Sequence, residues 1–339
     1  MIKEAIHVLA EEHQNLSTEQ TEEVVGQILD GVATPGQTTA FLAALRAKGE
    51  TADEILGCVR AMRQRAPRVN CNGIAAVDIG GTGGDRSGTF NISTTAAFVV
   101  AAAGLPVAKH GNRHFSSQAG SADLIEALGI KLQLSPDRVG ACLGEVGMAF
   151  LFTPAFYPAP PNLSQLRREI GIRSIFNLAG PVANPANVAC QTVGVAQPGL
   201  TEVLARVLAR LGKRHVLIFF GLDGLDEISI CAKTKISELK EGKIRTFYLE
   251  AETLGLQHAR LEDIRGGTAK ENARICLDVL SGKKGPPRDI VLLSAAAALI
   301  AGDRVTDFST GLTLAKEAID SGRACQILER LRDFNHHES

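Results

Sequence analysis

Glycine and hydroxyl side chains dominate residues 78–94, which read Asp-Ile-Gly-Gly-Thr-Gly-Gly-Asp-Arg-Ser-Gly-Thr-Phe-Asn-Ile-Ser-Thr. Glycine has no Cβ atom, so backbone N–H groups in such a segment can approach an anion closely. The segment follows an apolar stretch that predicts a strand and leads into one that predicts a helix, whose N-terminus favours negative charge. This arrangement predicts a phosphate-binding loop. The alternative is a glycine-rich turn with a Ser or Thr helix cap.

Two common nucleotide-binding motifs do not match this loop. A Walker A loop needs a lysine where Thr89 stands, and the dinucleotide fingerprint fails at Arg86. The segment therefore predicts a phosphate site of another kind.

Residues 109–123 form a second polar segment, Lys-His-Gly-Asn-Arg-His-Phe-Ser-Ser-Gln-Ala-Gly-Ser-Ala-Asp, again between an expected strand and an expected helix. Lys109 offers a point charge for phosphate oxygens, and Arg113 offers a planar fork that can bind them bidentately. Ser121 suits either a phosphate contact or the N-cap of the following helix. His110 and His114 could transfer protons, although a loop histidine also serves as a packing or hydrogen-bonding group.

Two adjacent carboxylates, Asp226 and Glu227, follow the apolar run 215–221. Hard carboxylate oxygens hold Mg²⁺, which itself engages phosphate oxygens. We therefore expect a magnesium site here, with a solvated surface pair as the alternative.

The elements that must position these residues fall into two groups. The first seventy residues predict short helices only, with capping signals at Ser17, at Thr34 before Pro35, and at Thr51. After residue 73, strands and helices alternate, which predicts a largely parallel sheet covered on both faces. Ligands bind such sheets at the carboxyl ends of the strands, where the polar loops are expected. The expected strands are 75–79, 106–109, 148–152, 191–196 and 215–221, and the first helices between them are 94–103 and 121–128.

These patterns predict an α/β protein with a small N-terminal helical domain and a larger domain built on a mostly parallel central sheet flanked by helices. The helical domain is expected at 1–72, joined by a crossing segment at about 160–188. The α/β domain is expected at 73–159 and 189–339.

Composition excludes several classes of protein. The 36 Lys and Arg against 37 Asp and Glu give a net charge of −1, which argues against a nucleic-acid surface, and 45% hydrophobic residues argue against disorder. Apolar runs are too short for a membrane span, and no secretory signal is visible. Seven scattered cysteines predict reduced thiols rather than disulfides. We expect a cytoplasmic protein that binds neither membrane nor nucleic acid.

Several motifs together resemble one family. Gly81-Thr-Gly-Gly-Asp85, Asn91-Ile-Ser-Thr94 and Lys109-His-Gly-Asn-Arg113 look like the signature loops of the anthranilate phosphoribosyltransferases, which are similar to the pyrimidine nucleoside phosphorylases. The likeness continues, in order, at 167–177, 180–185, 224–229, 285–294 and 318–322, so it spans essentially the whole chain.

The resemblance implies transfer of phosphoribose from phosphoribosyl pyrophosphate to anthranilate, with release of pyrophosphate, in tryptophan biosynthesis. It implies that Ser93, Asp226 and Glu227 bind Mg²⁺ and that Lys109, Asp226 and Glu227 serve catalysis. The substrate-binding residues that it implies are Gly81, Gly84, Asp85, Thr89, Asn91, Ile92, Ser93, Thr94, Lys109, His110, Gly111, Asn112, Arg113, Ser116, Ser117, Ser121 and Arg167.

The acceptor side of the site is expected to use Gly81, Asn112 and Arg167. Arg167 would supply a guanidinium for the anthranilate carboxylate. The alternative is a surface cation, with Arg168 and Arg173 as nearby competitors.

The sequence departs from the family at three places. Gln118 stands where a Lys or Arg is usual, His114-Phe115 replaces smaller residues, and Tyr157 stands where the family often has His. A related phosphoribosyltransferase or phosphorylase with another amine or nucleobase acceptor is therefore the alternative function, and a non-catalytic phosphate-binding protein is a further one. The resemblance also implies a homodimer formed through the helical domain.

Overall fold

The computed structural model describes residues 1–67, 69–113, 119–157, 159–160 and 162–336. Four of its helices form an N-terminal bundle: α1 (Ile2–Ala10), α2 (Thr18–Leu29), α3 (Pro35–Lys48) and α4 (Ala52–Arg65). The side chains of Ser17, Thr34 and Thr51 each accept a hydrogen bond from the backbone N–H three residues on, in complete capping boxes. The capping signals therefore predicted these three helix starts correctly.

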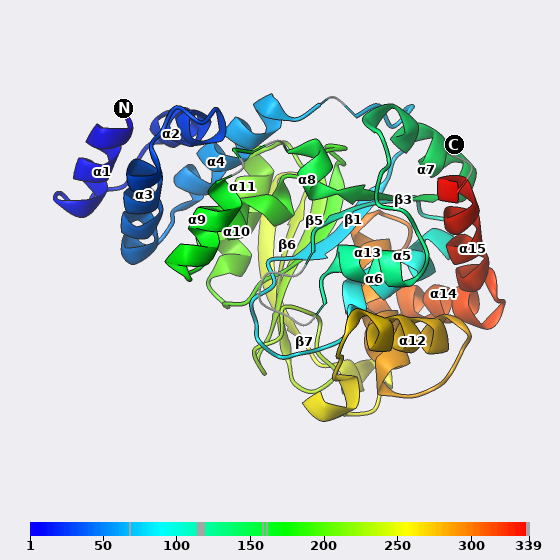
Figure 1. Cartoon of the computed structure of the whole chain (residues 1–339). Helices are drawn as coiled ribbons and strands as arrows, with labels where there is room; N and C mark the ends of the chain where they lie inside the picture. Colours follow the sequence, from blue (N-terminus) through cyan, green and yellow to red (C-terminus); the bar gives the residue numbers. More distant parts are fainter. Residues whose placement is uncertain (68, 114–118, 158, 161, 337–339) are drawn as a thin grey trace.

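A seven-stranded sheet in the order β3-β2-β1-β4-β5-β6-β7 forms the centre of the rest of the chain (Figure 1). The first five strands of the chain run parallel, while β6 pairs antiparallel with both β5 and β7. The mostly parallel sheet is thus confirmed. The strands are β1 (Val77–Gly81), β2 (Val107–Gly111), β3 (Met148–Phe152), β4 (Cys190–Gly194), β5 (His215–Gly221), β6 (Thr234–Lys240) and β7 (Lys243–Leu249).

The β6–β7 hairpin is the part of the sheet that the sequence pattern did not predict. Its turn is Glu241-Gly242, between β6 and β7. The residues on either side of the turn form strands. The sequence does not show the apolar alternation of a half-buried strand there, because Ser237 and Glu238 are buried polar residues.

Helices cover both faces of the sheet. One face packs against the C-terminal helices and the helices beside β2 and β3, and the other packs against α10, α11 and the bundle (Figure 1). Strand β5 shows the division, since Leu217 and Phe219 point to the first core while Val216, Ile218 and Phe220 point to the second. The remaining helices are α5 (Ile92–Ala102), α6 (Ser121–Ala127), α7 (Val139–Val146), α8 (Thr153–Phe156), α9 (Leu163–Ile170), α10 (Ile175–Ala179), α11 (Leu200–Arg210), α12 (Ala269–Leu280), α13 (Pro286–Ala301), α14 (Phe308–Asp320) and α15 (Arg323–His336).

Strands β1 and β4 are adjacent, although the chain leaves them in opposite directions along the sheet, toward β2 and toward β5. Such a switch in strand order opens a crevice at the carboxyl ends of the strands, where α/β proteins bind ligands. Within the described part of the chain, none of the helices combines the length and apolarity that a membrane crossing requires.

Candidate active site

Asp226 lies in the loop after β5, and this loop packs against the carboxyl ends of β1 and β4 at the crevice. Gly81 pairs with Gly194 in register. A Cβ atom on Gly194 would lie 1.6 Å from the Asp226 carbonyl oxygen, and one on Gly81 would lie 2.9 Å from Asp226 Oδ2. The two glycines therefore leave the space into which the loop after β5 folds.

Glu227 is buried and Asp226 is half-buried, and both carboxylates accept hydrogen bonds from backbone donors. The Gly83 N–H donates to Asp226 Oδ2 at 2.7 Å, and the Ser93 N–H donates to Glu227 Oε1 at 3.3 Å. Burial and the charge of Asp85 raise the pKa of Asp226 to about 7, and burial and the charge of Asp226 raise the pKa of Glu227 well above its usual range. Negative charge is thus unfavourable on this pair, and a bound cation would stabilise it.

The chemistry of these donors fits Mg²⁺. Among the described residues, no group of three or more His, Cys, Asp or Glu side chains could hold a metal ion. Mg²⁺ does not need one, because it usually keeps several waters and binds through one or two carboxylates together with substrate phosphates. Asp226 and Glu227, with the hydroxyl of Ser93 nearby, supply such a set.

Lys109 reaches across the end of the sheet from β2. Its side chain is buried, and Nζ donates to the carbonyl oxygen of Ile79 and to Ser93 Oγ, the latter at 3.3 Å. Burial lowers the pKa of Lys109, against the raising influence of Asp78 and Glu227. The expected catalytic cation and the expected metal ligands therefore meet at the N-terminus of α5.

The glycine-rich loop between β1 and α5 adopts a conformation that requires glycine. Gly83, Gly84 and Gly88 have φ of +60°, +80° and +70°, in the left-handed region that side chains disfavour. Arg86 shares this conformation with φ of +57°. The expected loop between a strand and a helix is therefore present, while its binding of phosphate stays a prediction.

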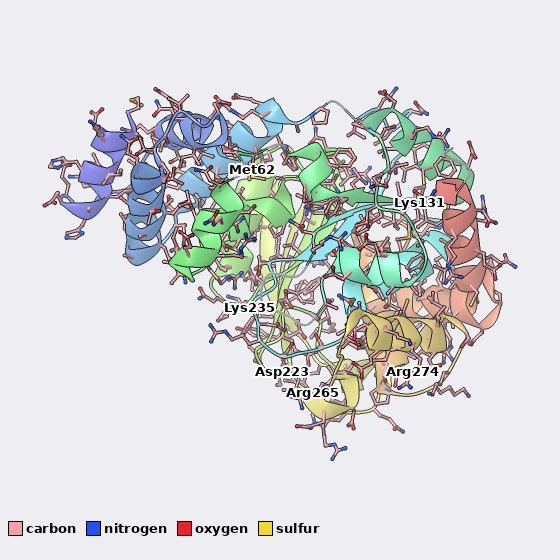
Figure 2. The ribbon with its side chains drawn as sticks, viewed as in Figure 1. Met62, Lys131, Asp223, Lys235, Arg265 and Arg274 are labelled. Atoms are coloured by element: carbon pink, nitrogen blue, oxygen red, sulfur yellow. The ribbon has the colours of Figure 1, made fainter. Side chains whose placement is uncertain are left out.

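A distant segment holds the far end of this loop. The Gly266 N–H donates to the Gly88 carbonyl oxygen at 2.8 Å, and Thr89 forms a bridge with Arg265, which is labelled in Figure 2. A Cβ atom on Gly266 would lie 2.6 Å from Phe90 Cα. This close backbone contact was not predicted from the sequence.

Asn91 is oriented by a residue that sequence reasoning missed. Asn272 Nδ2 donates to Asn91 Oδ1 at 2.9 Å, and Asn91 Nδ2 donates to the Ala119 carbonyl oxygen at 3.1 Å. Asn272 is itself fixed, because its Oδ1 accepts from the Gly267 N–H at 2.8 Å. A buried asparagine inside α12 gave no local signal of this role.

The first turn of α5 contains Ile92, Ser93 and Thr94, so the helix begins two residues before the predicted start at 94. The Ile92 and Thr94 side chains are buried. Only Ser93 of the three brings a side-chain oxygen to Lys109.

The loop after β2 is only partly described. Ser121 Oγ donates to the Asn112 carbonyl oxygen at 3.3 Å and would lie 2.1 Å from a Cβ atom on Gly111, so Gly111 permits this close contact. The predicted phosphate contacts Ser116 and Ser117 lie outside the described residues, as do His114, Phe115 and Gln118.

Arg113 is paired with two carboxylates of α6. Its guanidinium forms ion pairs with Asp123, at 3.2 Å, and with Glu126, and it lies 5.7 Å from the Phe152 ring centroid. Its expected phosphate contact would need a different side-chain position.

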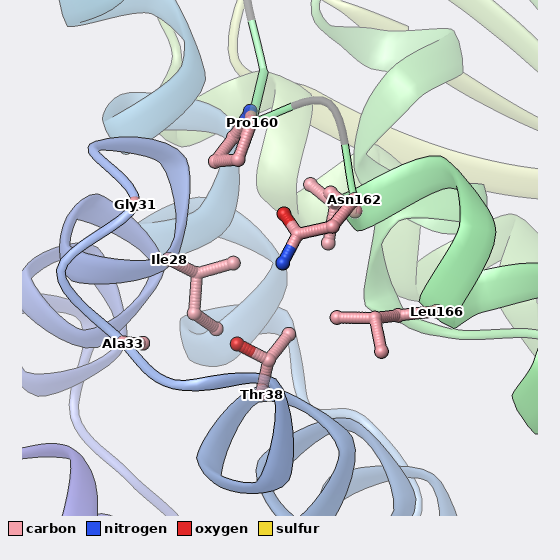
Figure 3. A pocket seen from close by; sticks show the side chains of 8 residues that line it. Ile28, Gly31, Ala33, Thr38, Pro160, Asn162 and Leu166 are labelled. Carbon is pink, nitrogen blue, oxygen red and sulfur yellow. The ribbon is translucent and has the colours of Figure 1, made fainter.

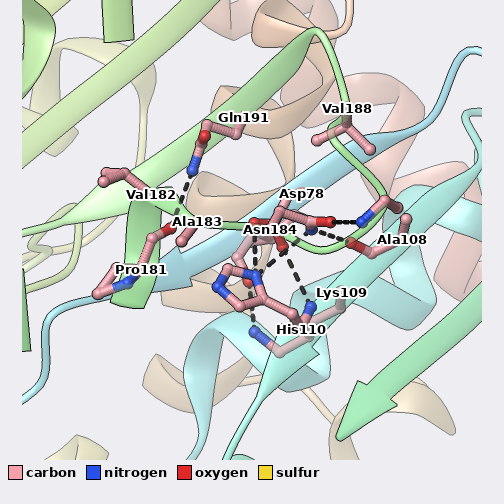
Figure 4. Close-up of polar contacts among 12 residues, drawn as sticks. Asp78, Ala108, Lys109, His110, Pro181, Val182, Ala183, Asn184, Val188 and Gln191 are labelled. Atoms are coloured by element: carbon pink, nitrogen blue, oxygen red, sulfur yellow. Dashed lines mark hydrogen bonds and ion pairs between the residues drawn. The ribbon is translucent and has the colours of Figure 1, made fainter. Parts of the chain in front are cut away.

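His110 is buried, and its ring lies close to Asp78 and Asn184 (Figure 4). Its Nδ1 lies 2.8 Å from Asp78 Oδ2, and its Nε2 lies 2.9 Å from the Gly180 carbonyl oxygen. Burial lowers the pKa of His110, but the charge of Asp78 outweighs burial, so the pKa is raised overall. Burial raises the pKa of Asp78, but the charge of His110 outweighs burial, so this pKa is lowered overall. His110, on β2, thus contacts Asp78 of β1 and the segment around Gly180. This contact of Asp78 was not predicted from the sequence.

Arg167 lies on α9, which packs beside the bundle. Its Nη2 donates to Asn177 Oδ1 at 3.2 Å, and its guanidinium lies 5.4 Å from the Phe176 ring centroid. Burial lowers the pKa of Arg167. This half-buried guanidinium is packed against an aromatic ring, unlike an ordinary surface cation.

A small cavity lies between α2, α3 and α9. It measures about 120 Å³, and the side chains of Thr38 and Asn162 point into it (Figure 3). None of the predicted site residues lines it, so we do not regard it as the substrate site. Its lining residues are Ile28, Gly31, Ala33, Thr38, Pro160, Asn162, Leu163 and Leu166.

Comparison with known proteins identifies the family of the chain. Residues 73–325 match the α/β domain of a glycosyl transferase family, and residues 3–66 match the helical bundle domain of a glycosyl transferase family. An anthranilate phosphoribosyltransferase from Symbiobacterium thermophilum is 54% identical over 96% of this chain and 95% of its own length. One from Moorella thermoacetica is 53% identical over 94% of each chain.

Solved structures extend the similarity to the fold. The anthranilate phosphoribosyltransferase of Thermus thermophilus has a TM-score of 0.90 and 38% identity, covering 99% of each chain. The enzyme of Saccharomyces cerevisiae, solved in complex with PRPP and Mg, has a TM-score of 0.90 and 28% identity, covering 99% of this chain and 98% of that one. The fold, the glycine-rich loop and the full-length similarity together show that this chain belongs to the anthranilate phosphoribosyltransferase family.

Proposed function

We propose that this chain transfers the 5-phosphoribosyl group of phosphoribosyl pyrophosphate to the amino nitrogen of anthranilate. The C–O bond to pyrophosphate breaks, a C–N bond forms, and N-(5-phosphoribosyl)anthranilate and pyrophosphate result, a step of tryptophan biosynthesis. The observation that carries the proposal is the meeting of the glycine-rich loop, Lys109 and Asp226-Glu227 at one crevice.

The donor half of the site is built for a pyrophosphate. Backbone N–H groups of Gly81 and Gly84, the hydroxyls around Ser93, and the charge of Lys109 would bind its oxygens. Further contacts are proposed for Asp85, Thr89, Asn91, Ile92, Thr94, His110, Gly111, Arg113, Ser116, Ser117 and Ser121.

Mg²⁺ is proposed as the cofactor, with Ser93, Asp226 and Glu227 as its protein ligands. When bound, it would neutralise charge on the pyrophosphate and so make it a better leaving group. The raised pKa values of both carboxyls support this assignment, because burial and neighbouring carboxylates disfavour the ionised forms, which a bound cation would stabilise.

The acceptor half would use Gly81, Asn112 and Arg167, with the Arg167 guanidinium binding the anthranilate carboxylate. Tyr157 lies where the family often has His, and its hydroxyl donates to the Ala183 carbonyl oxygen. The ring is therefore held in place by the chain and leaves the acceptor's carboxylate to Arg167.

The chain's own contribution to the reaction is positioning and charge. The aniline nitrogen of anthranilate is neutral near pH 7, so it needs no base before it attacks. Lys109 would stabilise negative charge as it develops on the leaving pyrophosphate, while the loops hold the two reactants in line.

The activity is tested with purified protein, phosphoribosyl pyrophosphate, anthranilate and MgCl₂, following the loss of anthranilate fluorescence. We expect turnover with anthranilate and none with nucleobases or with nucleosides plus phosphate. The double variant Asp226→Asn, Glu227→Gln should abolish turnover at millimolar Mg²⁺, whereas the exposed control Glu262→Gln should not. Turnover only with a nucleobase would establish the alternative acceptor, and full activity of the double variant would refute the metal assignment.

We propose that residues 1–72 form a helical domain, joined by the segment at about 160–188, and that 73–159 with 189–339 form the phosphoribosyl-binding domain. The boundaries of the two family matches, 3–66 and 73–325, support this division.

We propose a homodimer through the helical domain, supported by the exposed apolar side chain of Val32, and light scattering would test it. The seven free cysteines support a cytoplasmic location.

A further inference from the structure

A series of three hydrogen bonds connects α12 to both loops of the proposed pyrophosphate site. The Gly267 N–H donates to Asn272 Oδ1 at 2.8 Å, and Asn272 Nδ2 donates to Asn91 Oδ1 at 2.9 Å. Asn91 Nδ2 in turn donates to the Ala119 carbonyl oxygen at 3.1 Å. Asn91 ends the glycine-rich loop, and Ala119 belongs to the loop between β2 and α6. The buried Asn272 therefore acts on the place where the two loops meet.

Both ends of this series are backbone groups, and they fix the orientation of the two side-chain amides. Turning an asparagine amide by 180° exchanges its oxygen with its nitrogen. The Gly267 N–H can only donate and the Ala119 carbonyl can only accept, so Asn272 must present its nitrogen to Asn91, and Asn91 must present its oxygen to Asn272. The second hydrogen of Asn91 Nδ2 has no acceptor among the described residues. Asn91 thus keeps one N–H group for a ligand.

Asn91 is the N-cap of α5, but its side chain does not cap the helix. An N-cap asparagine ordinarily accepts a hydrogen bond from the N–H of the second or third helical residue, here Ser93 or Thr94. The Ser93 N–H donates to Glu227 instead, and the Thr94 N–H meets no acceptor among the described residues. Because Asn272 holds the oxygen of Asn91, the N-terminus of α5 keeps an open N–H group, where an anion binds favourably.

The segment before Asn272 is fixed against the glycine-rich loop at two further points. The Gly266 N–H donates to the Gly88 carbonyl oxygen at 2.8 Å, and the Phe90 N–H donates to the Ile264 carbonyl oxygen at 3.3 Å. A Cβ atom on Gly266 would lie 2.6 Å from Asn272 Oδ1, so glycine is needed for this close approach. The start of α12 therefore cannot shift from the loop without breaking backbone contacts.

We propose that Asn272 is a positioning residue for the phosphoribosyl pyrophosphate site. By holding Asn91 Oδ1, it makes Asn91 meet the substrate as a hydrogen-bond donor and leaves the Thr94 N–H open for a phosphate oxygen. An amide turned the other way would direct its oxygen at the anion, which is repulsive. The inference rests on the proposed function, in which Asn91 and Thr94 contact phosphoribosyl pyrophosphate.

The test is a double-mutant cycle on the affinity for phosphoribosyl pyrophosphate, measured by calorimetry with saturating MgCl₂ and without anthranilate. The proteins are the wild type, Asn272→Ala, Asn91→Ala and the double variant. Asn335→Ala is the matched control, because Asn335 is also a buried helical asparagine, and its Nδ2 donates to the Leu331 carbonyl oxygen at 2.8 Å. Urea unfolding of each protein separates a change in affinity from a change in stability.

Asn272→Ala should raise the dissociation constant about fivefold, because Asn91 loses the bond that orients it. In the Asn91→Ala background the same replacement should change the dissociation constant less than twofold, because Asn272 acts through Asn91. The KM for anthranilate and kcat should stay within twofold of the wild type, whereas a general loosening of the site would change them as well. Asn335→Ala should leave the affinity unchanged.

Asn272→Asp tests the orientation of the amides in a variant of nearly the same shape. One carboxylate oxygen still accepts from the Gly267 N–H, but the other faces Asn91 Oδ1 and repels it, so Asn91 must turn its oxygen toward the substrate. The affinity should fall at least tenfold, and Asn91→Ala should remove most of this loss. A loss caused by the added charge alone would persist in the Asn91→Ala background.

An unchanged affinity of Asn272→Ala, or an equal loss with and without Asn91, would overturn the inference. A wild type that binds no phosphoribosyl pyrophosphate would overturn the proposed function, and the inference with it. The two failures are therefore distinguishable.

Discussion

Replacement of Gly194 by alanine tests the construction of the metal site at the switch point of the sheet. A Cβ atom at this position would lie 1.6 Å from the Asp226 carbonyl oxygen, whereas real Cβ atoms essentially never come within 3.0 Å of another heavy atom. Strand β4 is hydrogen-bonded on both sides, so we expect the loop rather than the strand to yield. Asp226 must then move by about 1.4 Å, the difference between the two distances.

Such a displacement separates Asp226 from the Gly83 N–H and from the position of the pyrophosphate. Because a misplacement of about 1 Å can lower a rate on the order of 100-fold, we expect a loss of that size in kcat/KM for phosphoribosyl pyrophosphate. Overpacking should also lower the free energy of unfolding by about 1–3 kcal/mol. Anthranilate fluorescence across a range of Mg²⁺ concentrations measures the first effect, and urea unfolding measures the second.

The matched control is Gly199→Ala. Gly199 is the N-cap of α11, on the loop that follows the same strand, and a Cβ atom there would have no heavy atom within 4 Å. The control should keep its activity and its Mg²⁺ requirement. If the kcat/KM of Gly194→Ala for phosphoribosyl pyrophosphate stayed within threefold of that of the control, the site would not depend on the close approach of Asp226 to β4.

Three further predictions concern charge and strain. Below pH 7, metal affinity should fall about tenfold per pH unit for each proton that the metal displaces, because Asp226 has a pKa of about 7 and the pKa of Glu227 is also raised. Mn²⁺ titrations at pH 8 and pH 6 measure this change. Equal affinities at the two pH values would contradict the prediction. The Asp78–His110 pair should stabilise the fold fully between pH 3.8 and 6.5, the ordinary pKa values of the two groups. This stability should be lost as pH rises through the raised pKa of His110 or falls through the lowered pKa of Asp78, and urea unfolding of His110→Gln should show a flatter pH profile. Arg86→Gly should raise the free energy of unfolding by up to about 1 kcal/mol by relieving the positive φ, whereas Arg86→Ala should give no such gain.

Local chemistry explains what could be predicted from the sequence. A helix cap such as Ser17 acts on a backbone N–H three residues away, so its signal lies within a few letters of sequence. The glycine-rich loop is equally local, because its conformation depends on which residues tolerate a positive φ. The strands that carry Lys109 and precede Asp226 could be found because fully buried parallel strands are short apolar runs.

The partners of the site residues could not be found in this way. Asn272 contacts Asn91 from 181 positions away, and no periodicity relates the two. Arg113 was assigned to phosphate from its charge and its loop, but Asp123 and Glu126 compete for it in the folded chain. A residue's type limits what it can bind, while its neighbours in three dimensions decide which of those partners it meets.

The glycines of this protein carry as much of the site as its charged residues do. Lys109 would be an ordinary cation without the Ile79 carbonyl oxygen and Ser93 that fix its ammonium group. Asp226 could not reach the crevice if either strand end beside it carried a side chain, as the contacts at Gly81 and Gly194 show. Backbone that approaches so closely leaves no room for water between the groups, and charges in a water-excluded site interact more strongly than charges in solvent. Loss of a glycine at a strand end should therefore damage catalysis in the same way as loss of the carboxylate that it admits.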